Sequence, residues 1–473
     1  MTNILIVKLN GMYQLQCEHN KGSYAVASAT INTLRQYFPD ARFSSLVHFS
    51  EEFAEQHNIR VLRNKLLSSR KYSAGTTLKS SLHLVRASLW SLLHNRFPRV
   101  ARALVNHREL REYANADVIV DISMDLYCDG GGLAQVIEHS KEILIGTFMK
   151  KPVIIWAQSP GPFRSRLSRW LVRFALNRVA LILLREEISL DYIRELGVKG
   201  PQIHITADPA FLMKPAPKDR GKEILSREGI NGNDRPLVGL TMGWSNVRVN
   251  TRTKWYLRCI KSLYLAIRFF LPESFFEFRR KKATQSSNSD IPANATVKEI
   301  GKIVDCIVEE LGATVVLIPH DYNPIADDRN LARGILNNVK QANRVKIIAD
   351  GYSAPEIKSI IGQCDLFVGG KMHANIAATS MHIPTVAIQY GHKFYGIMRL
   401  LGQENYVCDK LAAEEVREKV REAWSNRDKI RADLEARTLI IQDQARHNAE
   451  LVVNLIDSDG HKAFPDKSIQ PNH

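Results

Sequence analysis

Residues 364–402 constrain the fold more than any other part of the chain. They read as a buried strand, a glycine break, a helix, a second buried strand and a loop rich in basic and aromatic residues. Five polar side chains follow the ends of these two strands: Lys371, His373, Tyr390, His392 and Lys393. Open α/β sheets bind ligands at the carboxyl ends of their strands, and a helix N-terminus beside a cation attracts anions. The segment therefore predicts an anion-binding site at the edge of a parallel sheet.

The rest of the chain repeats this alternation of strands and helices. Strand-like runs in the first half lie at 4–9, 42–47, 117–122, 153–157, 180–184 and 204–205. A stretch rich in proline and charge, 214–221, separates them from runs at 237–241, 314–318 and 345–348. Strands that alternate with helices predict a parallel, doubly wound sheet in each half. The predicted fold class is α/β, with two Rossmann-like doubly wound domains facing a cleft (GT-B-like) and a helical C-terminal segment.

The same pattern predicts the domain boundaries. The N-terminal Rossmann-like domain covers residues 1–215, with a basic insertion at 60–112. The C-terminal Rossmann-like domain, which is expected to bind the donor, covers 235–405, with a basic amphipathic insertion at 252–285. Residues 406–457 are expected to form C-terminal helices, and the polar stretch 458–473 is expected to be a disordered tail.

The net charge of +16 is concentrated in two segments. Residues 60–112 contain 12 Lys or Arg and 2 Glu, and residues 252–282 contain 9 Lys or Arg and 2 Glu, so the rest is nearly neutral. An amphipathic helix can be drawn in each, at 82–97 and 254–271. The first has an apolar stripe of Leu82, Val85, Leu89, Leu92 and Leu93.

Basic amphipathic helices with aromatic residues suggest an anionic membrane surface as a partner. Peripheral attachment to the inner face of the plasma membrane is therefore our hypothesis for these segments. The alternative is that the apolar stripes pack on the protein core and the cations are only solvated. No nucleic-acid-binding motif accompanies the charge, so no nucleic-acid partner is expected.

The cysteines and the N-terminus indicate the compartment. Six cysteines lie far apart in the sequence: Cys17, Cys128, Cys259, Cys306, Cys364 and Cys408. This spacing argues against a zinc ribbon or a disulfide framework and favours a reducing compartment. The chain leads almost at once into a strand-like run rather than a signal peptide, and no stretch is apolar for long enough to span a bilayer. We expect a cytoplasmic protein.

Motifs along most of the chain resemble the polysaccharide pyruvyl transferase family. The C-terminal signature of that family runs roughly Gly-x-Arg-x-His, Gly-x-Pro, Tyr-x-x-Lys and Leu-Gly. This chain has, in the same order, Gly369–His373, His382–Pro384, Tyr390–Lys393 and Leu401–Gly402. Further family-like pieces precede them: Asn20–Ser23, Asp125 with Gly130–Gly132, Gln158–Pro162, Arg185–Gly197, Asp208–Phe211 and Ile318–Asp321. The chain departs from the pattern in having Lys371 for the usual Arg, Ser23 for the usual Asp, and the two basic segments.

The resemblance implies a reaction with phosphoenolpyruvate as the donor. A pyruvyl group would pass to a sugar of a cell-surface polysaccharide or of its lipid-linked precursor, usually as a ketal across two hydroxyls, with release of phosphate. No metal and no redox cofactor is implied. The reaction requires neutralisation of a trianion, protonation of the methylene carbon, and loss of a proton from the attacking hydroxyl.

The residues that match the family motifs supply candidates for each requirement. Three cations are expected to neutralise the phosphate and carboxylate of the donor: Lys371, Arg185 and Lys393. His373 is the candidate for proton transfer, because imidazole titrates near neutral pH, and His320 with Asp321 is a second acid–base candidate. Four further residues are expected to contact substrate: Asn20, Gly22, Ser23 and Tyr390.

Other interpretations remain open at this point. Arg185 could instead pair with nearby acids on the following helix, namely Glu186, Glu187 or Asp191. Asp208, which precedes a proline, is interpreted as a structural turn. A GT-B glycosyltransferase that uses a nucleotide sugar would share the architecture, and Lys371 in place of Arg keeps that alternative open. The third interpretation is that the protein is a non-catalytic scaffold that binds glycan or lipid.

Overall fold

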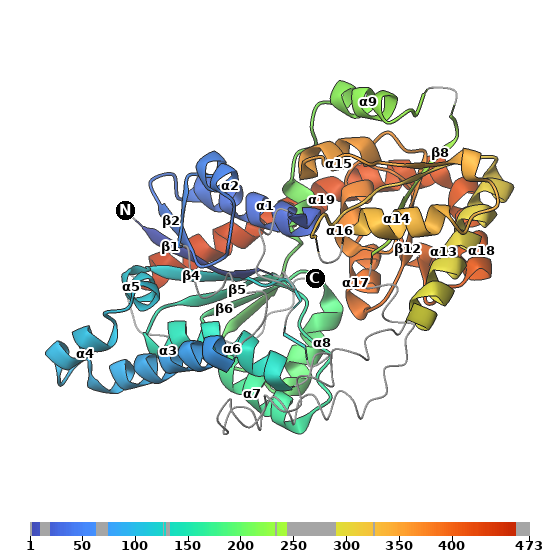
Figure 1. Cartoon of the computed structure of the whole chain (residues 1–473). Helices are drawn as coiled ribbons and strands as arrows, with labels where there is room; N and C mark the ends of the chain where they lie inside the picture. The colour runs from blue at the N-terminus through green and yellow to red at the C-terminus, as the bar shows by residue number, and fades with distance from the viewer. Residues whose placement is uncertain are drawn as a thin grey trace.

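The computed structural model describes residues 2–9, 19–62, 74–125, 127–128, 133–231, 234–243, 290–324 and 327–459. It contains two parallel β-sheets with helices packed against them, and the two sheets lie side by side in Figure 1. The predicted α/β class with two Rossmann-like domains is therefore confirmed.

Within the described residues, the N-terminal sheet has seven parallel strands in the order β3-β2-β1-β4-β5-β6-β7. The strands are β1 (Asn3–Leu9), β2 (Arg42–Ser45), β3 (Ile59–Val61), β4 (Val118–Ile122), β5 (Val153–Gln158), β6 (Leu181–Leu184) and β7 (Gln202–Ile205). The helices are α1 (Lys21–Tyr37), α2 (Glu51–Gln56), α3 (Ala74–Leu93), α4 (Pro98–Leu104), α5 (Arg108–Asn115), α6 (Leu133–Phe148), α7 (Arg166–Leu176) and α8 (Glu187–Leu196). The order reverses between β1 and β4, and such a switch point opens a crevice at the carboxyl edge.

The C-terminal sheet has, in the described part of the chain, six parallel strands in the order β10-β9-β8-β11-β12-β13. They are β8 (Leu237–Thr241), β9 (Thr314–Leu317), β10 (Val345–Ile347), β11 (Leu366–Gly369), β12 (Thr385–Ile388) and β13 (Val407–Cys408). The accompanying helices are α13 (Asp290–Leu311), α14 (Asp328–Leu336), α15 (Ala354–Ile361), α16 (Met372–Thr379), α17 (His392–Leu400) and α18 (Ala413–Ser425), with 3₁₀ turns η4 (Ala342–Arg344) and η5 (Glu404–Tyr406). Its switch point lies between β8 and β11, which leads directly into Lys371.

Apolar sequence explains why these strands form the cores. All six residues of β5 are buried, as are the strands β4, β6, β8, β9, β11 and β12. Strands that are covered on both faces require such continuous apolar runs rather than an alternating pattern. One core cluster extends from the α1 side of the N-terminal sheet into the C-terminal domain, so the two domains share buried surface.

Two connections join the domains. The chain passes through the 3₁₀ turn η2 (Pro209–Leu212) and α9 (Lys218–Arg227), and later returns in α19 (Arg427–Asp459), which runs beside α1 in Figure 1. Near its start, Arg431 donates to the carbonyl of Asp365 in the C-terminal domain (3.3 Å). Near its end, the Asn448 amide donates to the carbonyl of Ala207 (3.0 Å) and accepts from the Thr206 hydroxyl (2.7 Å). At 1.5 Å per residue this helix of 33 residues spans about 50 Å, enough to tie both domains together.

Some sequence expectations need correction. The helix drawn over 82–97 ends at Leu93, because a proline at 98 disfavours helical backbone in the residue before it. Strand β3 was not anticipated, since three residues are too few for a periodic signal. The basic insertion 252–285 with its helix at 254–271, the Gly130–Gly132 run and residues 460–473 of the expected tail lie outside the described residues. Residues 458 and 459 of that expected tail instead belong to α19. No helix in the described ranges is long and apolar enough to cross a membrane.

Candidate functional site

The N-terminus of α1 meets the loop after β9 across the domain boundary. Asn20 forms an antiparallel bridge with Asp321, and its side-chain amide donates to the Asp321 carboxylate (2.9 Å). The backbone amide of Lys21 donates to the carbonyl of His320 (3.0 Å). The Asn20 side chain also caps α1 by accepting from the amide of Ser23 (3.0 Å). These contacts hold the facing loops of the two domains together at the carboxyl edges of their sheets. We call this boundary between the domains the seam.

His373 lies at the centre of this seam, in the first turn of α16. Its ring packs against Gly22 so closely that a Cβ on Gly22 would lie 2.6 Å from the His373 Cγ and Nδ1. Its Nε2 is 3.6 Å from the Asp208 Oδ2, and that oxygen accepts a hydrogen bond from Arg185 Nη1 (2.6 Å). Arg185 Nε also donates to the Ser159 hydroxyl (2.7 Å). A histidine from one domain is thus aligned by an arginine–carboxylate pair from the other.

Burial makes this pair electrostatically strong. The side chains of Arg185 and Asp208 are 1% and 0% exposed. Burial alone opposes ionisation of Asp208, but the charge of Arg185 and the neighbouring His373 outweigh it and lower the pKa of Asp208 to about 2. Arg185 Nη2 and His373 Nε2 are buried without a hydrogen-bond partner among the described residues. Arg185 Nη2 is therefore available to a ligand, whereas His373 Nε2 faces Asp208.

Lys371 is the second cation of the seam. Its Nζ donates to Asp328 Oδ2 (2.6 Å), which also accepts the backbone amides of His320 (3.0 Å) and Asp321 (2.8 Å). Burial raises the pKa of Asp328 to about 6 against the opposing charge of Lys371. The pKa of Lys371 is raised, because Asp328 and Asp321 outweigh its burial. Both partners of this pair are therefore charged at neutral pH.

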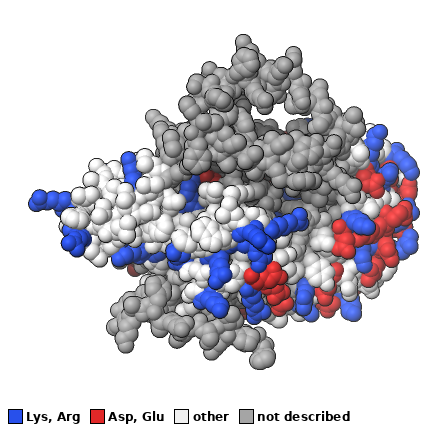
Figure 2. Space-filling model, turned by 90° about the horizontal axis from the view of Figure 1, so that it is seen from below, with Lys and Arg blue, Asp and Glu red and all other residues white. Residues whose placement is uncertain are grey.

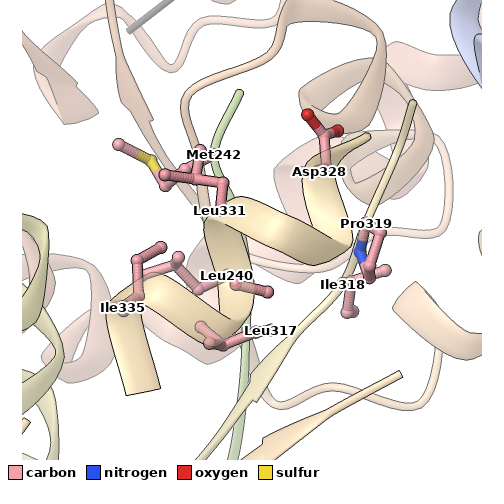
Figure 3. A pocket seen from close by; sticks show the side chains of 9 residues that line it. Leu240, Met242, Leu317, Ile318, Pro319, Asp328, Leu331 and Ile335 are labelled. Carbon is pink, nitrogen blue, oxygen red and sulfur yellow. The ribbon is translucent and has the colours of Figure 1, made fainter. Parts of the chain in front are cut away.

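The surroundings of Asp328 explain its burial. Figure 3 shows a small hollow beside it, with the carboxylate pointing away from the apolar side chains that line the remainder. The hollow is lined by Leu240, Met242, Leu317, Ile318, Pro319, Asp328, Leu331, Ala332 and Ile335. Since its single charged side chain is an acid, this hollow is not suited to an anionic donor.

The third cation connects the two domains directly. Lys393, at the start of α17, forms an ion pair with Asp125, which follows β4 in the N-terminal sheet. Its Nζ also lies 5.2 Å from the centre of the Tyr390 ring. Burial opposes the charge of Lys393, but Asp125 and Tyr390 favour it and raise the pKa of Lys393. Tyr390 also contributes to the raised pKa of Lys371, after the larger effects of Asp328 and Asp321.

The two histidine candidates differ in their surroundings. His320 is buried, and its burial together with the charges of Lys371 and His373 lowers the pKa of His320 well below its usual value. It is neutral at pH 7 and would act only as a weak base. His373 instead lies beside the ionised carboxylate of Asp208, with its Nε2 3.6 Å from Oδ2.

The structure brings the predicted residues to one seam: Asn20, Gly22, Ser23, Arg185, His320, Asp321, Lys371, His373, Tyr390 and Lys393. Their catalytic and binding roles stay predictions. The partner of Arg185 is Asp208 rather than an acid on α8. Asp208 does cap a turn, accepting from the Ala210 amide (2.8 Å), but it was missed as part of the site. Its position just after a strand-like run, at 204–205, was the available signal, whereas Asp328 gave none.

Outside the seam, three possible metal ligands lie together in the described residues. His83, His107 and Glu109 have ligand atoms within 4.8 Å of one another at the junction of α3 and α5. The His83 Nδ1 is 3.2 Å from the Glu109 carboxylate, so an ordinary hydrogen bond accounts for much of this arrangement.

Comparison with known proteins gives the family context. The family model described as polysaccharide pyruvyl transferase matches residues 20–392. The amylovoran biosynthesis protein AmsJ of Erwinia amylovora is 24% identical over 401 residues, which cover 82% of this chain and 85% of AmsJ.

Solved structures agree on the fold. HepE of Anabaena, solved with UDP and glucose, superposes with a TM-score of 0.52 at 11% identity, covering 97% of this chain and 100% of that one. A putative UDP-N-acetylglucosamine 2-epimerase of Listeria monocytogenes superposes with a TM-score of 0.55 at 11% identity, covering 99% of both chains. At such identity these similarities establish the two-domain architecture alone.

Proposed function

The chain belongs to the polysaccharide pyruvyl transferase family, and from this premise we propose that it transfers a pyruvyl group from phosphoenolpyruvate to a sugar of a polysaccharide or its lipid-linked precursor. The observation that carries the proposal is the convergence of three cations and His373 on one buried seam between the domains. A trianionic donor needs cations to bind it, and each of these three is held in place by a carboxylate. The AmsJ similarity supports a role in polysaccharide biosynthesis.

The proposed chemistry assigns a task to each group. Arg185, with its buried and unpartnered Nη2, and the two lysines hold the phosphate and carboxylate of the donor. His373 donates a proton to the methylene carbon, so that a C–H bond forms and the adjacent carbon becomes cationic. A sugar hydroxyl attacks that carbon, a C–O bond forms, and the hydroxyl proton returns to His373. A second hydroxyl then attacks the same carbon, the C–O bond to phosphate breaks, the phosphate leaves with the proton of that hydroxyl, and a ketal results.

Asp208 supports this sequence without touching substrate. Its ionised carboxylate lies 3.6 Å from the His373 Nε2 and orients the imidazole ring for the first step. No metal or redox cofactor enters the proposed steps, since the bond changes need only proton transfer and phosphate departure.

Thermal denaturation with candidate donors tests the proposal. A ligand at a hundred times its dissociation constant stabilises a protein by about 2.7 kcal/mol, which gives a clear shift of the melting temperature. Phosphoenolpyruvate should produce the shift, and Lys371→Ala and Lys393→Ala should weaken it. A shift with UDP-, GDP- or CMP-sugars alone would support the glycosyltransferase alternative. No shift with any donor would favour the non-catalytic scaffold.

A further inference from the structure

Four helices of the N-terminal domain form a surface away from the candidate site. Helix α3 packs beside α4 and α6, and α6 packs beside α7, so the four lie in one layer on the lower side of the sheet in Figure 1. We call the outer surface of α3, α4, α6 and α7 the basic–apolar face. Its composition differs from an ordinary solvated surface in two respects.

Large apolar side chains project from this face into solvent. The predicted stripe of α3 points outward: Leu82, Val85, Leu89 and Leu92 are 41–77% exposed. The opposite side of α3, with the buried His83 and Ala87, supplies its contact with the domain. Further exposed apolar residues come from the neighbouring helices: Phe97 and Val100 around α4, Ile137 on α6, and Leu167 and Trp170 on α7. The alternative that the α3 stripe packs on the core is therefore wrong for these four residues.

The charge contributed by α3, α4 and α7 has one sign, whereas α6 adds two half-buried acids, Glu138 and Glu142, of which Glu138 pairs with Lys141. Residues 82–108 and 164–178 contain five Arg each and no Asp or Glu. Figure 2 shows the consequence: basic atoms border a broad uncharged area on the side where α4 projects, whereas acidic and basic atoms mix on the opposite side. Apolar side chains bordered by arginines are typical of surfaces that insert into the headgroup layer of an anionic membrane.

From this arrangement we infer that the basic–apolar face binds an anionic lipid surface. Trp170, which is 61% exposed, and Phe97 are suited to the interfacial layer, and the surrounding arginines complement acidic headgroups. Self-association through the same face would place arginine against arginine in a two-fold dimer, so a second copy is a poor occupant. Charge complementarity thus selects a lipid surface.

The position of the face relative to the seam gives the inference a functional consequence. The loop from Ser159, whose hydroxyl accepts from Arg185, leads within a few residues to the first turn of α7. A lipid-linked acceptor could therefore stay in the bilayer while its sugar reaches the seam. Lipid binding goes beyond the proposed transferase activity and does not depend on it.

Co-sedimentation with vesicles tests the inference. The whole protein is mixed with vesicles of phosphatidylcholine alone or with about one third phosphatidylglycerol, at about 0.15 M and about 0.5 M salt. We expect binding to the anionic vesicles that high salt weakens. Arg99→Glu with Arg102→Glu should weaken binding at least tenfold, since each cation near an anionic surface contributes about a fivefold factor. Leu92→Ser with Trp170→Ser should weaken it at both salt concentrations.

Matched controls come from exposed residues elsewhere. Leu439 and Ile440 on α19 are 63% and 60% exposed, so their paired Ser substitutions should leave vesicle binding unchanged, as should Arg344→Glu. Equal sedimentation with neutral vesicles, no sedimentation at all, or equal losses in the controls would overturn the inference. Concentration-dependent dimerisation that Leu92→Ser abolishes, without vesicle binding, would reassign the face to a protein partner. If phosphoenolpyruvate produced no shift of the melting temperature, that result would count against the transferase proposal and not against lipid binding.

Discussion

Substitution of Asp208 by Asn probes the element on which the candidate site depends most. The Asp208 side chain is fully buried, accepts from Arg185 Nη1 at 2.6 Å and from the Ala210 amide at 2.8 Å, and lies 3.6 Å from His373. Asn keeps the size and one acceptor but removes the charge. The Arg185 guanidinium, 1% exposed, is then left as an uncompensated buried cation.

Breaking a buried ion pair from one side costs about 3–5 kcal/mol, and we expect Asp208→Asn to lower the free energy of unfolding by that amount. Denaturant-induced unfolding measures it. Asp365→Asn is the matched control, because Asp365 also accepts a backbone amide and pairs with an arginine, Arg235, at 2.7 Å. That pair is partly exposed, so its loss should cost below about 1 kcal/mol.

The same substitution should reduce turnover. Without the carboxylate opposite its Nε2, His373 loses its alignment, and misalignment of this kind costs about a hundredfold in rate. Phosphoenolpyruvate-dependent release of phosphate with the acceptor polysaccharide measures the effect. A variant that is as stable as Asp365→Asn and turns over normally would refute the role given to the Arg185–Asp208 pair.

Three further predictions use other contacts of the seam. Gly22→Ala would place a Cβ 2.6 Å from the His373 ring and should lower turnover at least tenfold. Gly391→Ala is the control and should leave turnover unchanged, because a Cβ there meets nothing within 4 Å. Equal turnover of the two variants would contradict this geometry. Lys371→Ala should weaken phosphoenolpyruvate binding about tenfold or more in calorimetry, because a charged hydrogen bond contributes roughly 1.5–3 kcal/mol; unchanged affinity would remove Lys371 from the donor site. The pKa of Asp208 is lowered to about 2, so its ionised form stabilises the fold above about pH 4, and this contribution disappears as the pH falls toward 2. Over that pH range the free energy of unfolding should therefore decrease less in Asp208→Asn than in the unaltered protein.

The sequence predicted the architecture because the fold rests on local patterns. Continuous apolar runs such as those of β5 and β11 are recognisable in the chain itself, and the glycine break before Lys371 marks the turn from strand to helix. The order of strands within each sheet, by contrast, depends on pairings between distant segments. A three-residue strand such as β3 carries too few residues for a periodic signal.

The sequence pointed to the cations, the histidines and Asp321 of the seam, but not to the carboxylates that pair with each cation. Asp125, Asp208 and Asp328 each pair with a cation of the seam, from positions 268, 23 and 43 residues away in the chain. No local pattern links such partners, because burial and tertiary contact decide which acid meets which base. Asp208 was interpreted as a turn residue, and it does form that turn as well as the ion pair with Arg185.

The replacement of the usual arginine by Lys371 can be understood from the same carboxylates. Lys371 Nζ reaches one oxygen of Asp328, which also accepts two backbone amides, while the other oxygen, Oδ1, is buried without a partner in the described part of the chain. A lysine supplies a point charge, whereas the arginine fork would engage both oxygens. Lys371 therefore provides charge and holds the loop of His320. In the proposed site, guanidinium recognition of the donor then falls to Arg185, through Nη2, which has no partner within the described residues, while its Nε and Nη1 bond to Ser159 and Asp208. A lysine at 371 is compatible with a phosphoenolpyruvate site as long as Arg185 keeps that role.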